Sequence, residues 1–194
     1  RLPAASGGVW DRVEALQRFD TALAAADPGA VARNLPAAWA RMAQAELEVP
    51  FAALYADALL RLPLTGEAGA LAFRIALLSP DYEKAAQTRL PTDATEVFLI
   101  GLARGTLQGV IPPDSMARAI APAFLRPAPS PEAQSLLLEN RLGEALLMAI
   151  DRIGRGVQGD LRGVTEGLSL LRRVGLEDVA RRTALELLLL ERRG

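Results

Sequence analysis

The sequence predicts an all-α protein of about ten short helices in a multi-helical array, built either as an irregular solenoid or as an orthogonal bundle. Apolar residues make up 51% of the 194 residues and aromatic residues only 5%, so the core must consist mainly of Ala and Leu, which favour helices. No stretch alternates apolar and polar residues for long enough to predict a strand. Thirteen prolines and sixteen glycines divide the chain into short segments.

The first two-thirds of the chain is divided mainly by proline-containing turns. Apolar residues at helical spacing predict the first helix, and the turn sequence at Asp27-Pro28-Gly29 predicts its end. Pro36 suits a first helical turn, where a missing N–H costs little, and Ser79 before Pro80 suits an N-cap. The helices expected here cover residues 9–26, 36–48, 51–62, 66–78, 80–89, 91–107 (ended by Gly109) and 112–122 (ended or kinked by Pro122).

The last third of the chain differs in composition, because no proline follows Pro131. The proline-rich segment 126–131 predicts a sub-boundary within a single all-α domain that covers residues 9–194, after a linker at 1–8. One long helix is expected over 132–153, followed by a loop at 154–159. Two further helices, 160–174 and 176–192, are expected to join at Gly175, which suits a left-handed helix C-terminus.

Part of this last third resembles tetratricopeptide-type helical repeats. The resemblance rests on Leu-Gly-Glu-Ala-Leu-Leu at 142–147, on the hairpin at 160–192, and on Gly-Leu-Glu-Asp-Val-Ala-Arg-Arg at 175–182, which is similar to the start of a second repeat helix. It covers about the last 60 residues and lacks the aromatic and proline positions of the full repeat. The resemblance implies stacked helical hairpins that bind a protein partner.

Two residue types that carry much of enzyme chemistry are absent. The chain has no His and no Cys, which removes the usual general base, the thiol nucleophile and the commonest metal ligands. We therefore expect no metal and no cofactor. A net charge of −1 gives no general attraction to nucleic acid, and no apolar run is long enough to cross a membrane. Lys84 is the only lysine, which together with abundant Ala, Leu and Gly suggests a GC-rich bacterial genome.

Two motifs have a functional and a structural interpretation. Residues 154–159 match the G-x-G-x-x-G pattern of dinucleotide-binding loops, but such a loop follows a strand, whereas a helix is expected here. We interpret it as a glycine-rich helix connection. The second motif is a set of arginines near the C-terminus, Arg172, Arg173, Arg181, Arg182, Arg192 and Arg193. Glu177 and Asp178 each precede an arginine by four residues, which favours a self-neutralised helix face over nucleic-acid contact.

Pairs of carboxylates are the remaining candidates for acid–base chemistry. They are Glu46 with Glu48, Asp81 with Glu83, and Glu177 with Asp178, and none lies in a known motif. Neighbours one or two residues apart on a helix point in different directions, which argues against joint action. Asp81 and Glu83 are better explained as first-turn charges that favour helix formation.

Five residues are the candidates for binding a protein or peptide partner: Trp39, Tyr55, Tyr82, Leu187 and Leu190. The aromatic residues are large amphipathic side chains of the kind that anchor interfaces, although such residues also fill helical cores. The leucines belong to a C-terminal helix that is apolar on nearly every side. That helix is expected either to pack on more than one side or to join a second copy in a homo-oligomer.

The leading functional hypothesis is therefore a non-enzymatic interaction or scaffold module that binds a protein or peptide. One alternative is a helical accessory domain of an exported cell-wall-active enzyme, which rests on analogy of fold. Another is a carboxylate-dependent enzyme. The small-residue start of the sequence and the absence of Cys favour a periplasmic or secreted location over a cytoplasmic one.

Overall fold

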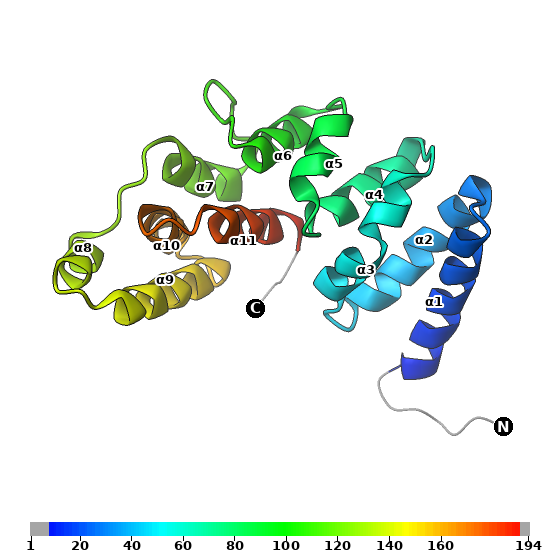
Figure 1. Cartoon of the computed structure of the whole chain (residues 1–194), viewed down its shortest axis with the longest axis horizontal. Helices are drawn as coiled ribbons and strands as arrows, with labels where there is room; N and C mark the ends of the chain where they lie inside the picture. Colours follow the sequence, from blue (N-terminus) through cyan, green and yellow to red (C-terminus); the bar gives the residue numbers. More distant parts are fainter. Residues whose placement is uncertain (1–7, 191–194) are drawn as a thin grey trace. The chain divides into compact units, whose positions relative to one another are not determined.

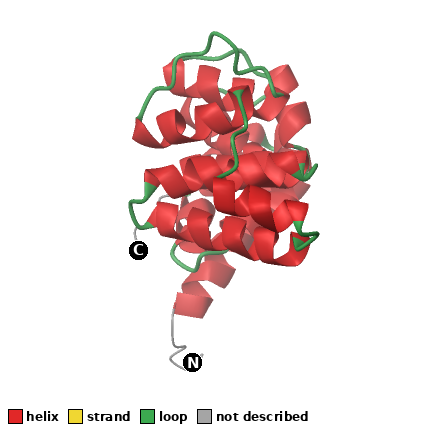
Figure 2. Ribbon diagram, turned by 90° about the vertical axis from the view of Figure 1, so that its left-hand side faces the viewer, coloured by secondary structure: helices red, strands yellow, loops and turns green. Residues whose placement is uncertain are grey.

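A computed structural model of the chain describes residues 8–190, and this part contains eleven α-helices and no strand (Figures 1 and 2). The all-α prediction is confirmed. The helices are α1 (Val9–Ala24), α2 (Pro28–Ala43), α3 (Glu48–Leu60), α4 (Gly66–Leu77), α5 (Tyr82–Thr88), α6 (Ala94–Arg104), α7 (Ser115–Leu125), α8 (Pro131–Leu138), α9 (Leu142–Val157), α10 (Leu161–Arg173) and α11 (Glu177–Leu189).

Side-chain caps fix the starts of five helices. Asp27, Asp93, Asp114, Ser130 and Asp160 each accept a hydrogen bond from the backbone N–H three residues further on. Each bond satisfies a donor that has no partner within the helix. At the other end, Gly105 terminates α6 with a φ of 71°, and Gly175 lies between α10 and α11 with a φ of 87°, as expected for that glycine.

The second helix begins eight residues earlier than predicted. Asp27 caps α2 and Pro28 occupies its first turn, so the residues that end the first helix also start the second. Pro36 therefore lies inside α2 rather than at its start. Similarly, α6 ends at Gly105 and not near Gly109, because Gly105 already supplies the left-handed conformation that terminates a helix.

The long helix predicted over 132–153 is two helices, α8 and α9. The break lies at Asn140, which has a left-handed φ of 59°, a conformation that Asn tolerates better than most residues. The predicted glycine loop at 154–159 is also largely wrong, because α9 continues through Gly154 and Gly156 to Val157. With a helix and no strand directly before the motif, it lacks the context of a dinucleotide-binding loop.

The chain divides into two compact units after Ala85. The proline-rich segment 126–131, expected as a sub-boundary, lies inside the second unit. In the first unit, α1 pairs with α2, which also contacts α3 and α4. Its core contains an aromatic cluster in which Phe51 lies centrally, with ring centroids 5.4 Å from Phe19, 4.9 Å from Tyr55 and 5.9 Å from Trp39.

The second unit is packed through small residues. Helix α10 lies against α7 and α9, and α11 packs against α6, α7 and α10, so the C-terminal helix is covered on more than one side as predicted. Glycines bring α9 and α10 close together. A Cβ on Gly163 would lie 2.5 Å from the Arg152 carbonyl oxygen, and one on Gly167 would lie 2.8 Å from the Ala149 carbonyl oxygen. These distances leave no room for a side chain.

Candidate functional site

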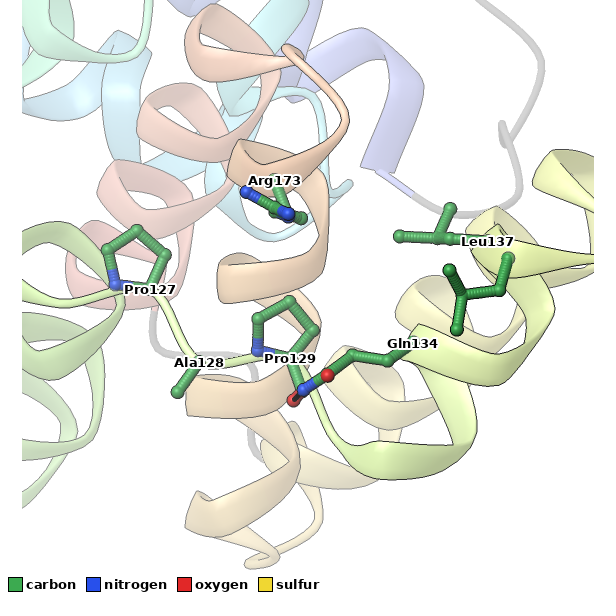
Figure 3. A pocket seen from close by; sticks show the side chains of 7 residues that line it. Pro127, Ala128, Pro129, Gln134, Leu137 and Arg173 are labelled. Atoms are coloured by element: carbon green, nitrogen blue, oxygen red, sulfur yellow. Dashed lines mark hydrogen bonds between the residues drawn. The ribbon is translucent and has the colours of Figure 1, made fainter. Parts of the chain in front are cut away.

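A hollow of about 480 Å³ opens in the second unit between the proline-rich segment, α8 and the C-terminal end of α10 (Figure 3). Its lining combines two prolines, two leucines and one arginine with a small and an amide side chain. We call it the α8–α10 groove, and its lining residues are Pro127, Ala128, Pro129, Gln134, Leu137, Leu138 and Arg173.

The proline wall of the groove is held in an extended conformation. Proline restricts the residue before it to extended backbone, and Ser130, which precedes Pro131, has φ −60° and ψ 157°. Ser130 then caps α8 through the backbone N–H of Ala133. The Gln134 side-chain amide donates a 2.8 Å hydrogen bond back to the Pro129 carbonyl oxygen. The wall is therefore tied to the helix that forms the opposite side.

Arg173 provides the charge of the groove. Its neighbour Arg172 is fully engaged, with Nε 2.5 Å from a Glu177 oxygen, Nη1 donating to the Ala123 carbonyl at 2.7 Å, and the guanidinium 5.0 Å from the Phe124 ring centre. Arg173 is exposed and makes no ion pair or hydrogen bond within residues 8–190. Figure 3 shows Arg173 on α10, with Leu137 of α8 across the hollow. An unpaired cation beside apolar walls is suited to a carboxylate on an apolar ligand.

The other arginines of the predicted basic face are mostly structural. Arg181 makes the expected ion pair with Glu177 at 3.0 Å and also donates to the Ala103 carbonyl at the end of α6. Burial of Glu177 opposes ionisation, but hydrogen bonds and charge from Arg172 and Arg181 lower its pKa overall. Arg192 and Arg193 lie outside the described residues. Arg172 and Arg181 therefore attach α10 and α11 to their neighbours rather than forming a free basic surface.

A second hollow of about 500 Å³ gathers acids, at the junction of α8, α9 and α10. Its four carboxylates belong to Glu132, Asp151, Asp160 and Glu166. Three are ion-paired: Glu132 and Glu166 with Arg152, Glu166 also with Arg162, and Asp151 with Arg155. Asp160 accepts the Gly163 N–H as a helix cap. This hollow therefore holds a neutralised ionic network and not a pair of carboxylates available for proton transfer.

No known family matches the chain. Neither a curated protein nor a solved structure matches it either. The resemblance of the C-terminal part to tetratricopeptide-type repeats stays a prediction. Among the described residues, no helix is long and apolar enough to span a membrane, and no group of acids is arranged to hold a metal ion.

The carboxylates considered from the sequence have different surroundings in the structure. Glu46 is exposed at a left-handed position with φ 54°, whereas Glu48 is only 8% exposed, and its Oε2 has no hydrogen bond in the part of the chain that is described. Asp81 donates its backbone N–H to the Ser79 hydroxyl at the turn before α5. Glu177 is occupied by two arginines.

The five candidate partner-binding residues are divided between the two units. Trp39 and Tyr55 are half-buried in the aromatic cluster of the first unit, and Tyr82 is only 2% exposed, so it belongs to the core. Burial and the nearby charge of Asp20, which also forms a hydrogen bond, raise the pKa of Tyr55. In the second unit, Leu187 is half-buried and Leu190 is buried at the end of α11.

Sequence reasoning missed the α8–α10 groove. From the sequence, the segment 126–131 predicts only a boundary between helices, and Arg173 is one of several arginines near the C-terminus. The groove brings together residues more than forty positions apart, and nothing in the local pattern distinguishes Arg173 from Arg172. The break at Asn140, which sets where α8 ends, also has no strong sequence signal.

Proposed function

We propose that the chain is a non-enzymatic interaction module that binds a peptide segment of a partner protein in the α8–α10 groove. An apolar side chain of the peptide would lie between Leu137 and Pro129, and a carboxylate would pair with Arg173. The observation that carries the proposal is the combination of apolar walls with an exposed cation that has no partner in the described part of the chain.

The distribution of charges supports binding over catalysis. Three acids of the second hollow are paired with three arginines, whereas Arg173 of the apolar groove has no charged partner among residues 8–190 and can take an external anion. Pro127 and Pro129 have no N–H, and the Pro129 carbonyl is already bonded to Gln134, so the proline wall offers mainly apolar contact. An accessory domain of an exported enzyme would use the same surface, and bacterial origin and export remain proposals.

The test uses two sets of short fluorescent peptides, because the natural partner is unidentified. Each peptide of the first set carries one Leu or Phe and one Glu at varied spacing, and the second set replaces Glu by Gln. We expect the Glu peptides to bind more tightly by fluorescence anisotropy, with affinity that falls as salt rises. In ¹⁵N spectra, shifts should concentrate at Ala128, Gln134 and Arg173, because the prolines have no amide signal.

Two variants separate specific binding from general charge effects. Arg173→Glu should weaken binding of the Glu peptides by about tenfold, which corresponds to the loss and reversal of one charge pair. Arg118→Glu makes the same change at an exposed arginine on α7 outside the groove and should leave binding unchanged. If neither peptide set binds, or if both variants weaken binding equally, the α8–α10 groove is not a peptide site.

A further inference from the structure

Helix α9 exposes a stripe of apolar and small residues. Gly143, Leu147, Ile150 and Gly154 fall within an arc of about 60° on the helix surface. All four are exposed, Leu147 at 67% and Ile150 at 64%, and a Cβ added to either glycine would meet nothing within 4 Å. The opposite side of α9 carries Ala145 and Ala149, both fully buried. The stripe is therefore an open face, separate from the α8–α10 groove.

The spacing and the type of residues in the stripe are the same in both directions along the helix. Its residues are separated by four, three and four positions, with a glycine at each end and a branched aliphatic residue on each side of the centre. Two such helices placed antiparallel about a two-fold axis would set Gly143 against Gly154 and Leu147 against Ile150, in both directions. Glycines at the ends allow close approach of the two backbones.

Charged residues beside the stripe would form ion pairs between the two copies in this arrangement. Glu144 and Arg155 lie on the same side of the stripe, near opposite ends of α9. A two-fold axis between antiparallel helices brings each side of one helix against the same side of the other, so Glu144 of each copy would meet Arg155 of the second copy. Within the chain these residues pair with Arg141 and Asp151 in exposed ion pairs, which are weak and can be shared or exchanged.

From these observations we propose that α9 pairs with the α9 of a second copy of this chain, as an antiparallel two-fold helix pair. A C₂ contact must be self-complementary, and the stripe has this property in spacing, in size and in charge. The contact is built on α9 and not on the C-terminal helix. One helix face is small compared with the roughly 800 Å² per partner of standard interfaces, so the dimer should have a dissociation constant in the micromolar range.

Sedimentation equilibrium of the full chain over a range of concentrations tests the proposal. We expect reversible dimerisation, abolished by Ile150→Asp, because this change places an unpaired carboxylate at the centre of the contact. Leu54→Asp is the matched control, since Leu54 is 75% exposed on α3 and lies far from α9 in the sequence. It should leave the dissociation constant unchanged, as should Arg173→Glu in the α8–α10 groove. A chain that is monomeric at all concentrations would overturn the proposal.

A charge exchange makes the test independent of any folding defect. Glu144→Arg places two arginines against each other and Arg155→Glu two glutamates, so each variant alone should dimerise about tenfold more weakly. Mixing the two single variants restores opposite charges at both contacts, and the mixture should form heterodimers as tightly as the unaltered chain. A mixture no tighter than either variant would rule out the antiparallel pairing. The antiparallel pairing would also be ruled out if the chain did not dimerise but floated with phosphatidylcholine vesicles, and if this flotation depended on Leu147 and Ile150.

Discussion

The two units of the molecule differ in the share of aromatic residues in their cores. Seven of the nine aromatic residues lie at or before residue 85, and the first unit has a cluster in which Phe19, Phe51 and Tyr55 touch through ring faces and edges. The second unit contains only Phe98 and Phe124. In the second unit, glycines allow close contacts between helices and arginines donate to carbonyls near the ends of neighbouring helices, around a core that includes Phe98, Leu102 and Ile120.

This contrast predicts opposite sensitivities to mutation. A core of large side chains is weakened most by losing atoms, because the cavity left behind closes only partly. A contact between small residues is weakened most by gaining atoms, because the helix backbones already touch. The ion pairs of the first unit are exposed, such as Arg18 with Glu14. The second unit has exposed pairs as well, but it also contains the largely buried Arg89–Glu96 pair.

The largest effect is expected for removal of a fully buried aromatic ring of the first unit. Phe19 is 0% exposed and contacts both Phe51 and Tyr55, so Phe19→Ala should lower the free energy of unfolding by about 3–5 kcal/mol. Urea denaturation followed by circular dichroism measures the change. Leu54→Ala, at an exposed position of the same unit, should change stability by less than about 0.5 kcal/mol. A loss below about 1 kcal/mol for Phe19→Ala would contradict the aromatic core.

Addition of one methyl group should destabilise the second unit. In Gly167→Ala the new Cβ would lie 2.6 Å from Ile153 Cγ1 and 2.8 Å from the Ala149 carbonyl oxygen, which forces α9 and α10 apart. We expect a loss of about 1–3 kcal/mol, measured by thermal denaturation. Gly143→Ala is the matched control on α9, with open space around its Cβ. Because Ala favours helices over Gly, that variant should be more stable by about 0.5–1 kcal/mol. Equal effects would refute the close contact.

The sequence predicted those parts of the fold that depend on local chemistry. Acidic and proline residues at helix starts, such as Asp114, and the left-handed Gly175 could be placed because caps act over three or four residues. The break at Asn140 and the start of α2 were missed, since Asn is only a weak signal for a left-handed turn and Asp27-Pro28 can both end and begin a helix.

Residue burial and the groove depend on packing, which local patterns do not specify. In α11, Leu185 and Leu189, four residues apart, are buried, whereas Leu187 and Leu188 are half-buried. Apolar residues occur on nearly every side of that helix, so its sequence does not identify the buried side. Arg172 and Arg173 differ by one helix position, about 100° around the axis, and this rotation separates a structural arginine from a free one.

A smaller effect, dependent on pH, is expected for the buried ion pair of the second unit. Burial of Glu96 opposes its ionisation, but hydrogen bonds from Arg89 and from the Thr92 backbone N–H lower its pKa below the ordinary value of about 4.3. The ionised form therefore stabilises the fold above that value, and the contribution is lost as the pH falls through the lower pKa of the folded state.

Glu96→Gln should accordingly cost about 1–2 kcal/mol at pH 7 and progressively less below about pH 4. Denaturant titrations of both proteins across this range measure the difference. Glu14→Gln removes an exposed carboxylate from the first unit and should have a small effect with little dependence on pH. A Glu96→Gln penalty that stays constant between pH 3 and pH 7 would show that Glu96 acts through packing and not through its charge.

The smallest effect on stability is expected for Arg173, and the comparison with Arg172 gives this result its meaning. Arg172→Ala removes an ion pair, a hydrogen bond to the Ala123 carbonyl and contact with Phe124, so it should cost about 1–2 kcal/mol. Arg173→Ala removes no such contact and should change stability by less than about 0.5 kcal/mol by thermal denaturation. If a residue does not stabilise the fold, its identity can be determined by ligand binding alone. If Arg173→Ala is as costly as Arg172→Ala, then Arg173 is a structural residue and the α8–α10 groove loses the free charge on which peptide binding depends.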